Sequence, residues 1–302
     1  MKNLRLVIIV LIPFLLNNCV TKLKEKGSSE YIEEIKKWHN RRIENLKKEN
    51  GWLNLVGLYW LKQGENKFGS SSKNDIVFPA GEAPKFIGSF TLNGSNVRVK
   101  INKNIEVKSD GKIVEEMELI SDEKGEPTIL SYGSLRWFVI KRGEKFGIRL
   151  RDLEAPLVRS FTGIETFPIN SDWRIIADFK KYDRPRKIEI PNILGSAEID
   201  STSGEVVFKK NNKTYSLIAL DEGNLLFIIF GDKTNGEETY GGGRFLYANK
   251  PDSAGKVILD FNKAYNPPCV FTKYATCPLP PEQNHLDLEV TAGEKMFHGG
   301  AH

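Results

Sequence analysis

The sequence predicts a mainly β protein, with a short N-terminal helix followed by a β-sandwich-like domain and a second β-sandwich or barrel domain. After Gly51, apolar and polar residues alternate in short runs, as they do in half-buried strands. Clusters of Gly, Asn, Asp and Ser separate these runs. Helical spacing is confined to one segment before Gly51. Many short strands with frequent turns are typical of sandwiches and barrels.

Residues 1–19 have the pattern of a bacterial lipoprotein signal peptide. The apolar stretch 6–16 is too short to span a bilayer comfortably. Leu16 precedes Cys19 by three residues, as in a lipobox, although Asn18 replaces the usual small residue. We therefore expect lipidation of Cys19, with the lipid bilayer as a partner and the protein exported and anchored in the cell envelope, at the periplasmic face or the outer membrane. The alternative is an uncleaved apolar anchor with an incidental cysteine.

The charge of the mature chain does not indicate a nucleic-acid partner. The whole chain carries a formal charge of +5, and removal of residues 1–18 takes away Lys2 and Arg5 and leaves +3. Basic residues are interspersed with acidic ones along the chain, whereas a nucleic-acid footprint needs them clustered.

Residues 20–50 are expected to form a tether and the N-terminal helix. The tether, residues 20–28, contains lysines and no apolar period. Ser29 can cap the helix and Gly51 can stop it. His39 lies beside the apolar stripe without an evident partner, so a structural or solvated role is expected. The stripe has the spacing of three and four that a helix requires, and its members are Ile32, Ile35, Trp38, Arg42/Ile43 and Leu46.

Residues 51–133 are expected to form the first β domain. Gly64 to Gly69 and the segment 74–79 resemble the opening strands of a forkhead-associated domain. That family binds phosphothreonine with an Arg directly after the second Gly, and Ser70 occupies this position here. No Ser-x-x-His follows. The resemblance implies a degenerate sandwich that has lost the phosphopeptide site, so no phosphopeptide partner is expected.

Residues 134–295 are expected to form the second β domain, followed by an unpatterned tail, 296–302. A hairpin turning at residues 142–144 places Arg149, Arg151 and Asp152 at a strand end. A meander follows, and Leu225 to Phe230 is apolar on both faces, as expected of a central strand.

The stretch 239–281 concentrates glycines, prolines, two cysteines, an arginine and a pair of Asp and Asn residues more than any other part of the chain. Its glycines, Gly241 to Gly243, permit positive φ and close backbone approach, and its prolines fix φ. A rigid loop of this kind carries function more often than stability.

The same stretch resembles the bacterial domain-of-unknown-function family number sixteen-eighty-four. The resemblance covers residues 31–295 and implies no established activity. It rests on Tyr-Gly-x-Gly-Arg-Phe-Leu at 240–246, Leu-Asp-Phe-Asn-x-Ala-Tyr-Asn-Pro-Pro-Cys at 259–269, Ala-Thr-Cys-Pro-Leu-Pro-Pro at 275–281, and the segments 51–61 and 149–152.

The chain has three cysteines. If Cys19 carries lipid, Cys269 and Cys277 remain, and a pair eight residues apart in an exported protein is expected to form a disulfide. Thiol chemistry is an alternative, with Cys269 as nucleophile and His285 as base, or with both cysteines and His285 as zinc ligands. The spacing suits neither arrangement well. No metal and no cofactor is expected.

The leading functional hypothesis is a cell-envelope lipoprotein that binds a polar or anionic small ligand at the loop 239–281. Arg244 follows the three glycines, and its planar fork suits a carboxylate or phosphate. Asp260 and Asn262 would share one strand face, and Tyr265 and Asn266 follow. One alternative is a small hydrolase or transferase that uses Arg244 to hold charge and Asp260 or Tyr265 for proton transfer. Another is a structural Arg244–Asp260 ion pair with turn-capping asparagines.

Overall fold

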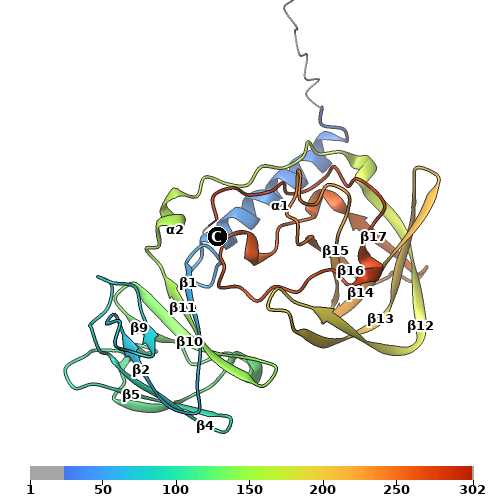
Figure 1. Ribbon diagram of the computed structural model, residues 1–302. Coiled ribbons are helices and arrows are strands. Elements are labelled where there is room, and N and C mark those ends of the chain that lie inside the picture. The colour runs from blue at the N-terminus through green and yellow to red at the C-terminus, as the bar shows by residue number, and fades with distance from the viewer. Residues whose placement is uncertain (1–23, 301–302) are drawn as a thin grey trace, which may run out of the picture.

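The computed structural model describes residues 24–300 (Figure 1). The expected signal peptide, the lipidation of Cys19 and the last two residues of the tail lie outside this range. Within it, no helix is long and apolar enough to cross a membrane.

Helix α1 (Ser29–Lys47) begins one residue earlier than a cap at Ser29 would require. Ser28 is the N-cap, and its Oγ accepts a hydrogen bond from the backbone N–H of Tyr31 (3.2 Å). The apolar stripe faces the protein, with Ile35 and Leu46 fully buried. The rest of the helix surface is polar and mostly exposed, so packing of this stripe holds the helix in place.

The first β unit is a sandwich of two antiparallel sheets, with one parallel pair at an edge. The first sheet has the order β1 (Leu55–Trp60), β11 (Lys145–Asp152), β10 (Leu135–Arg142), β9 (Leu130–Tyr132), β6 (Lys108–Ser109) and β7 (Lys112–Ile113). The second has the order β3 (Ile76–Val77), β2 (Gly64–Gly69), β4 (Gly88–Asn93), β5 (Asn96–Ile101) and β8 (Glu116–Leu119). An aromatic cluster of Phe68, Phe78, Phe90 and Trp137 fills the space between them.

The sheet pairing corrects the expected boundary between residues 133 and 134. Strands β10 and β11 form the predicted hairpin, but β11 also pairs with β1, and β10 pairs with β9. Residues 135–152 therefore belong to the first sandwich. The physical reason is long-range pairing: β1 has no other strand neighbour in this sheet, and local alternation does not reveal its partner.

The second β unit is a single six-stranded sheet that is nearly closed into a barrel (Figure 1). Its order is β16 (Arg244–Asn249), β15 (Leu225–Phe230), β14 (Lys213–Glu222), β13 (Ala197–Lys210), β12 (Arg174–Pro191) and β17 (Lys256–Asp260). The buried interior contains Phe208, Phe230, Leu246, Leu259 and Phe261. The predicted fold class, mainly β with one short N-terminal helix and two β units, is confirmed.

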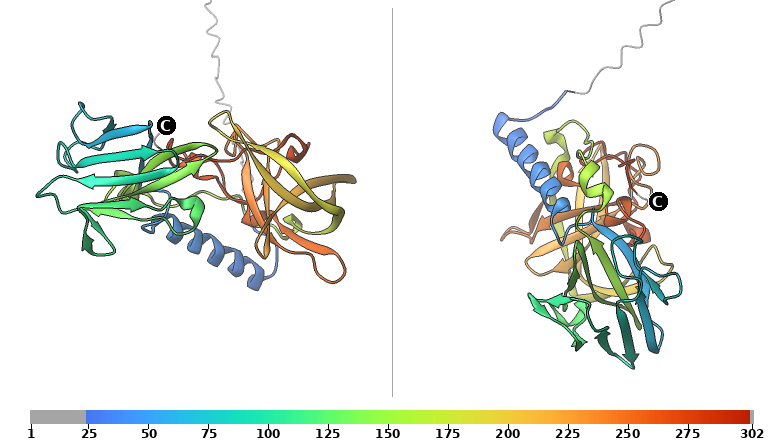
Figure 2. Two further views of the ribbon diagram at one scale, coloured as in Figure 1. Left: turned by 90° about the horizontal axis from the view of Figure 1, so that it is seen from below. Right: turned by 90° about the vertical axis from the view of Figure 1, so that its left-hand side faces the viewer.

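Short helical segments connect the strands. They are α2 (Pro156–Ser160) and the 3₁₀ turns η1 (Asp122–Lys124), η2 (Ser171–Trp173), η3 (Phe261–Lys263), η4 (Pro268–Val270) and η5 (Glu282–Asn284). Helix α1 packs against segments near the C-terminus of the chain, through Glu294 and Lys263. The first sandwich lies near the last turn of this helix (Figure 2).

Candidate functional site

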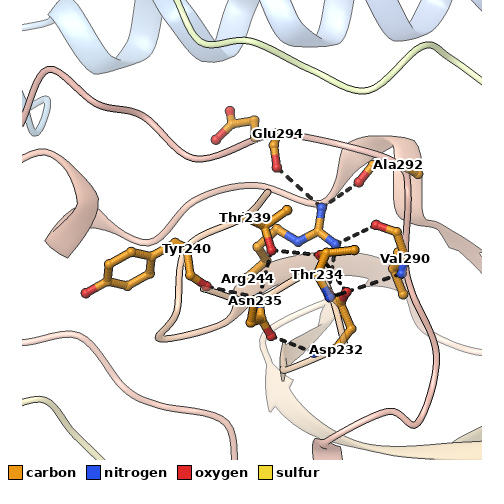
Figure 3. Close-up of polar contacts among 9 residues, drawn as sticks. All are labelled: Asp232, Thr234, Asn235, Thr239, Tyr240, Arg244, Val290, Ala292 and Glu294. Carbon is orange, nitrogen blue, oxygen red and sulfur yellow. Dashed lines mark hydrogen bonds and ion pairs between the residues drawn. The ribbon is translucent and has the colours of Figure 1, made fainter. Parts of the chain in front are cut away.

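Arg244, the centre of the predicted ligand loop, is completely buried in a structural network (Figure 3). Its Nη2 donates to Asp232 Oδ2 and to the carbonyl oxygen of Val290, both at 2.8 Å. Its Nη1 donates to the carbonyl oxygens of Ala292 (2.5 Å) and Glu294 (3.3 Å). Only Nε lacks an acceptor among the described residues. Burial lowers the pKa of Arg244, and the Asp232 carboxylate opposes that shift.

The carboxylate of Asp232 is equally satisfied. Its Oδ1 accepts hydrogen bonds from the hydroxyl and the backbone N–H of Thr234 (2.6 and 2.9 Å) and from the N–H of Val290 (3.2 Å). The ion pair with Arg244 is therefore fully enclosed and hydrogen-bonded, which is the condition for burying two charges at tolerable cost. The expected partner Asp260 is corrected to Asp232, and the buried guanidinium has no exposed face for a ligand.

The glycine run before Arg244 also has a structural explanation. Gly243 has a φ of +85°, and a Cβ there would lie 2.5 Å from Pro280 Cγ and 2.6 Å from the carbonyl oxygen of Phe230. Only glycine fits a positive φ and such a close approach together. At this position glycine allows the proline segment to pack against β15.

Asp260 and Asn262 meet, but not as neighbours on a strand face. Strand β17 ends at Asp260, and Asn262 lies in η3, so the period-two argument is wrong. Asp260 Oδ1 instead accepts from the backbone N–H of Asn262 (3.2 Å) and from the Tyr31 hydroxyl of α1 (2.8 Å). Asn262 Oδ1 accepts from the N–H of Asn170 (2.9 Å). These contacts fasten the start of α1 to the second β unit.

Tyr265 and Asn266 fasten the middle of the same helix. The guanidinium of Arg42 lies 4.4 Å from the centre of the Tyr265 ring and donates to the carbonyl oxygen of Asn266 (2.9 Å). Arg42 Nε also donates to Glu294 Oε1 (3.2 Å), while Glu294 Oε2 accepts from the N–H of Asn266 (2.7 Å). Burial raises the pKa of Glu294, and the positive charge of Arg42 opposes this shift. The structure thus places these four predicted residues under α1, in contacts that join the helix to the loop.

A different part of the molecule carries unpaired charge, namely the outer face of the first sheet. Residues 135, 137 and 139 of β10, and 148 and 150 of β11, point into the sandwich core. Because side chains alternate along a strand, Arg136 and Phe138 project outward, with Arg149 and Arg151 opposite them in register. Arg142 follows on the same face. We call Arg136, Arg142, Arg149 and Arg151 the arginine face.

The two outer members of the arginine face have carboxylate partners, and the two central members have none in the described part of the chain. Arg136 Nε donates to Glu49 Oε1 (2.8 Å), and Arg142 Nη1 donates to Asp122 Oδ2 (2.9 Å). Within residues 24–300, neither Arg149 nor Arg151 forms an ion pair. These two side chains are nevertheless only 4% and 7% exposed.

The central pair lies against an aromatic ring, and the groups that accept hydrogen bonds from Arg151 are neutral. Both guanidinium groups lie near the Trp52 ring, at 5.5 Å for Arg149 and 5.8 Å for Arg151. Arg151 donates to the carbonyl oxygen of Gly51 and to Asn54 Oδ1 (2.8 Å). Nε and Nη2 of Arg149 are buried without an acceptor among the described residues. Burial lowers the pKa of each to about 10, and for Arg149 the neighbouring charges of Arg142 and Arg151 add to the effect. The more distant carboxylates of Asp122 and Glu49 oppose the shift, for Arg149 and Arg151 respectively, but do not offset it.

A cavity of about 920 Å³ opens over this face beside Arg151. Its volume lies in the range of small-molecule sites. The end of α1, the segment 126–129 and the first sheet form its walls. The lining residues are Lys48, Glu49, Asn50, Ser109, Asp110, Met117, Ile120, Glu126, Pro127, Thr128, Ile129, Arg136, Phe138 and Arg151.

The disulfide loop contacts the same sheet. Cys269 and Cys277 form the predicted disulfide, with their Cα atoms 6.1 Å apart. Between them, the Thr272 hydroxyl donates to the carbonyl oxygen of Leu55 on β1 (3.0 Å). Just before Cys277, Thr276 Oγ1 accepts from Arg142 Nε (3.3 Å). The ligand loop predicted from the sequence therefore reaches the arginine face through its second half.

The disulfide removes the thiol that the catalytic alternative requires, because a bonded sulfur is not a nucleophile. His285 lies at the end of η5, where its backbone pairs with Gly231. Among the described side chains, no group of three or more His, Cys, Asp and Glu is arranged to hold a metal ion.

Together these features define a mainly β protein with a structural ion pair in its second unit and a cavity beside the arginine face on its first. The profile of the family described as "Protein of unknown function (DUF1684)" matches residues 159–295. This match confirms, for residues 159–295, the family resemblance that the sequence motifs predict. The arginine face precedes the matched segment in the sequence.

Among the solved structures that are similar to part of the chain, one shows what such a match covers. It is the solution NMR structure of an uncharacterized protein of Haloarcula marismortui, with 30% sequence identity over 47% of this chain and 80% of that chain, and a TM-score of 0.40. A comparison with curated proteins gives no match.

The sequence contained a signal for the arginine face that the motif search did not use. Arg149 and Arg151 have the period-two spacing of one strand face, and the hairpin at 142–144 places Arg136 opposite Arg151. Burial of that face depends on Trp52, the end of α1 and the disulfide loop, which are distant in sequence.

Proposed function

We propose that this chain is an exported, lipid-anchored envelope protein whose folded body binds a small anionic molecule at the arginine face. The observation that carries the proposal is the burial of Arg149 and Arg151 without a carboxylate partner among the described residues. The anionic ligand expected at Arg244 is thereby assigned to another place in the molecule.

The physical argument is one of charge compensation. A buried cation without a counter-ion is costly, and Arg remains charged because its pKa stays far above neutral pH. An anion entering the cavity beside Arg151 supplies the missing charge, and the guanidinium fork can bind a carboxylate or a phosphate through two hydrogen bonds. Arg136 and Arg142 need no such ligand because Glu49 and Asp122 already pair with them.

The hydrolase or transferase alternative has no comparable support. In it, Arg244 would hold the substrate while Asp260 or Tyr265 transferred a proton. Arg244 is enclosed by Asp232 and backbone carbonyl groups, and Asp260 already accepts a hydrogen bond from Tyr31. Binding is therefore the function that the contacts favour.

Calorimetric titration with acetate, inorganic phosphate and citrate tests the anion site. We expect saturable binding of at least one of these probes, and a loss of tenfold or more in affinity for both Arg149→Met and Arg151→Met. Arg98→Met is the matched control, since Arg98 is exposed on β5 and paired with Glu116 (3.2 Å). Binding that is unchanged in both arginine variants, or absent for every anion, would overturn the proposal.

Mass spectrometry of the mature protein tests the anchor. We expect a mature N-terminus at an acylated Cys19, and Cys19→Ala should remain uncleaved or leave the membrane fraction. An unmodified N-terminus at another residue would contradict the lipoprotein assignment and would leave the anion site unaffected.

A further inference from the structure

The cavity over the arginine face has an apolar wall as well as a cationic floor. Met117 and Ile120 at the end of β8 and Ile129 before β9 line it, together with Phe138 on the sheet. Ile120 and Ile129 are 49% and 47% exposed. Large aliphatic side chains that remain exposed around a cavity are a feature of ligand sites, because a bound apolar group would remove their surface from water.

The charges around the cavity favour a ligand with one negative charge. Lys48, Arg136 and Arg151 are the cations among its lining residues, and the three carboxylates are those of Glu49, Asp110 and Glu126. These charges cancel. Arg149 adds one further cation, which lies next to Arg151 on β11 and has no ion-pair partner within residues 24–300. A single carboxylate would neutralise the site, whereas a dianion would introduce excess negative charge beside the lining carboxylates.

We propose that the ligand is an amphipathic monoanion of the aliphatic monocarboxylate class. Its carboxylate lies against Arg151, and its hydrocarbon chain extends along Met117, Ile120 and Ile129. This inference rests on the anion site proposed above and specifies its ligand: neither the cationic floor nor the apolar wall alone would select such a molecule.

Calorimetry with a series of straight-chain carboxylates, from acetate to decanoate below the micellar concentration, tests the inference. Affinity is expected to rise about fourfold for each methylene that becomes buried. Decanol and decylammonium have the same chain without the negative charge, so we expect each to bind at least tenfold more weakly than decanoate.

Two variants separate the apolar wall from the floor. Ile129→Asn should lower decanoate affinity tenfold or more while acetate affinity changes much less, because Asn is polar and adds no charge. Ile176→Asn is the matched control, because Ile176 is 67% exposed on β12 and does not line the cavity. Both substitutions are on exposed side chains, so the fold is expected to tolerate them.

The outcomes distinguish the two proposals. Arginine-dependent binding of acetate or phosphate with no gain from chain length overturns the monocarboxylate inference and leaves the anion site standing. Equal binding of decanol and decanoate, unaffected by Arg151→Met, overturns both. Decanoate binding that is weakened in Arg151→Met and in Ile129→Asn, but kept in Ile176→Asn, supports the inference.

Discussion

Arg244 and Arg149 are both buried on β-strands, yet their surroundings are opposite. Arg244 has a carboxylate partner and three backbone carbonyl acceptors. Arg149 has no ion-pair partner among residues 24–300, and two of its nitrogens are buried without an acceptor. The first side chain is part of a completed structural network. The second lacks a counter-charge in a region that contains a cavity.

The comparison shows why residue type alone misled the search for a site. An arginine after three glycines has the pattern of an anion-binding site, but the carboxylate of Asp232 is already the anion that Arg244 binds. The decisive property is whether the charge is compensated within the protein, and this depends on tertiary packing. Four predictions test the comparison.

The largest effect is expected at Arg244. Replacing it with Met would leave Asp232 buried without its counter-ion and should reduce the free energy of unfolding by about 3 to 5 kcal/mol. The double variant Arg244→Met/Asp232→Leu should recover much of this loss. Urea denaturation of the three proteins measures both effects. Equal losses in the single and double variants would mean that the pair is not coupled.

His39 is only half-buried, and it accommodates a basic side chain in a third way, by losing the proton. Burial lowers its pKa from 6.5 to about 4. Because the folded-state pKa is depressed, the unfolded chain binds more protons between these values. The stability contribution is therefore fully present above pH 6.5 and is lost as the pH falls toward 4.

Replacement of His39 with Gln should flatten this dependence. The advantage of the wild type at pH 7 over pH 4 should exceed that of the variant by about 3 kcal/mol. Unfolding free energies at several pH values between 4 and 7 check this, with the exposed His298→Gln as the control. Parallel profiles for wild type and His39→Gln would contradict a depressed pKa in the folded state.

The disulfide supports the loop that contacts the arginine face. Closing a loop of this length contributes about 2.6 kcal/mol in the chain-entropy model. Cys269→Ala/Cys277→Ala should lose this amount in urea denaturation. It should also weaken anion binding, because Thr272 and Thr276 hold the loop against the first sheet. Full retention of both properties would show that the loop is held by packing alone.

The smallest effect is expected at Arg149, and its sign is opposite to that at Arg244. Without ligand, Arg149→Met removes an uncompensated buried charge and should raise the free energy of unfolding by about 1 kcal/mol. Urea denaturation in ligand-free buffer measures it. A loss of several kcal/mol would place Arg149 in the same structural class as Arg244 and would remove the contrast between them.

The fold was largely predictable because its signals are local. Alternating runs identified the strands, and the hairpin at 142–144 appears where it was expected. The pairing of β1 with β11 joins segments about ninety residues apart, which alternation does not encode. The prediction that Asp260 and Asn262 share a strand face was wrong for a similar reason. Asp260 ends β17 and caps the 3₁₀ turn that contains Asn262.

The site was less predictable for a related reason. The residues named from the sequence are real contact points, but Asp260, Tyr265 and Asn266 bind residues of α1 that lie more than 200 positions away. Contacts between residues so far apart leave no regular spacing in the sequence from which they could be predicted. The disulfide was predictable because only the composition and the expected compartment decide it.

Helix α1 has a consequence for where a ligand would be encountered. The first sandwich lies away from residue 24, toward the far end of the helix (Figure 2). Nineteen residues span about 28 Å at the α-helical rise, and the residues after the last turn line the cavity. If lipid holds Cys19 at a bilayer, α1 acts as a rigid spacer between the anchor and the cavity. A protein of this build would capture amphiphiles already dispersed in the aqueous compartment, and their free concentration there would set its occupancy.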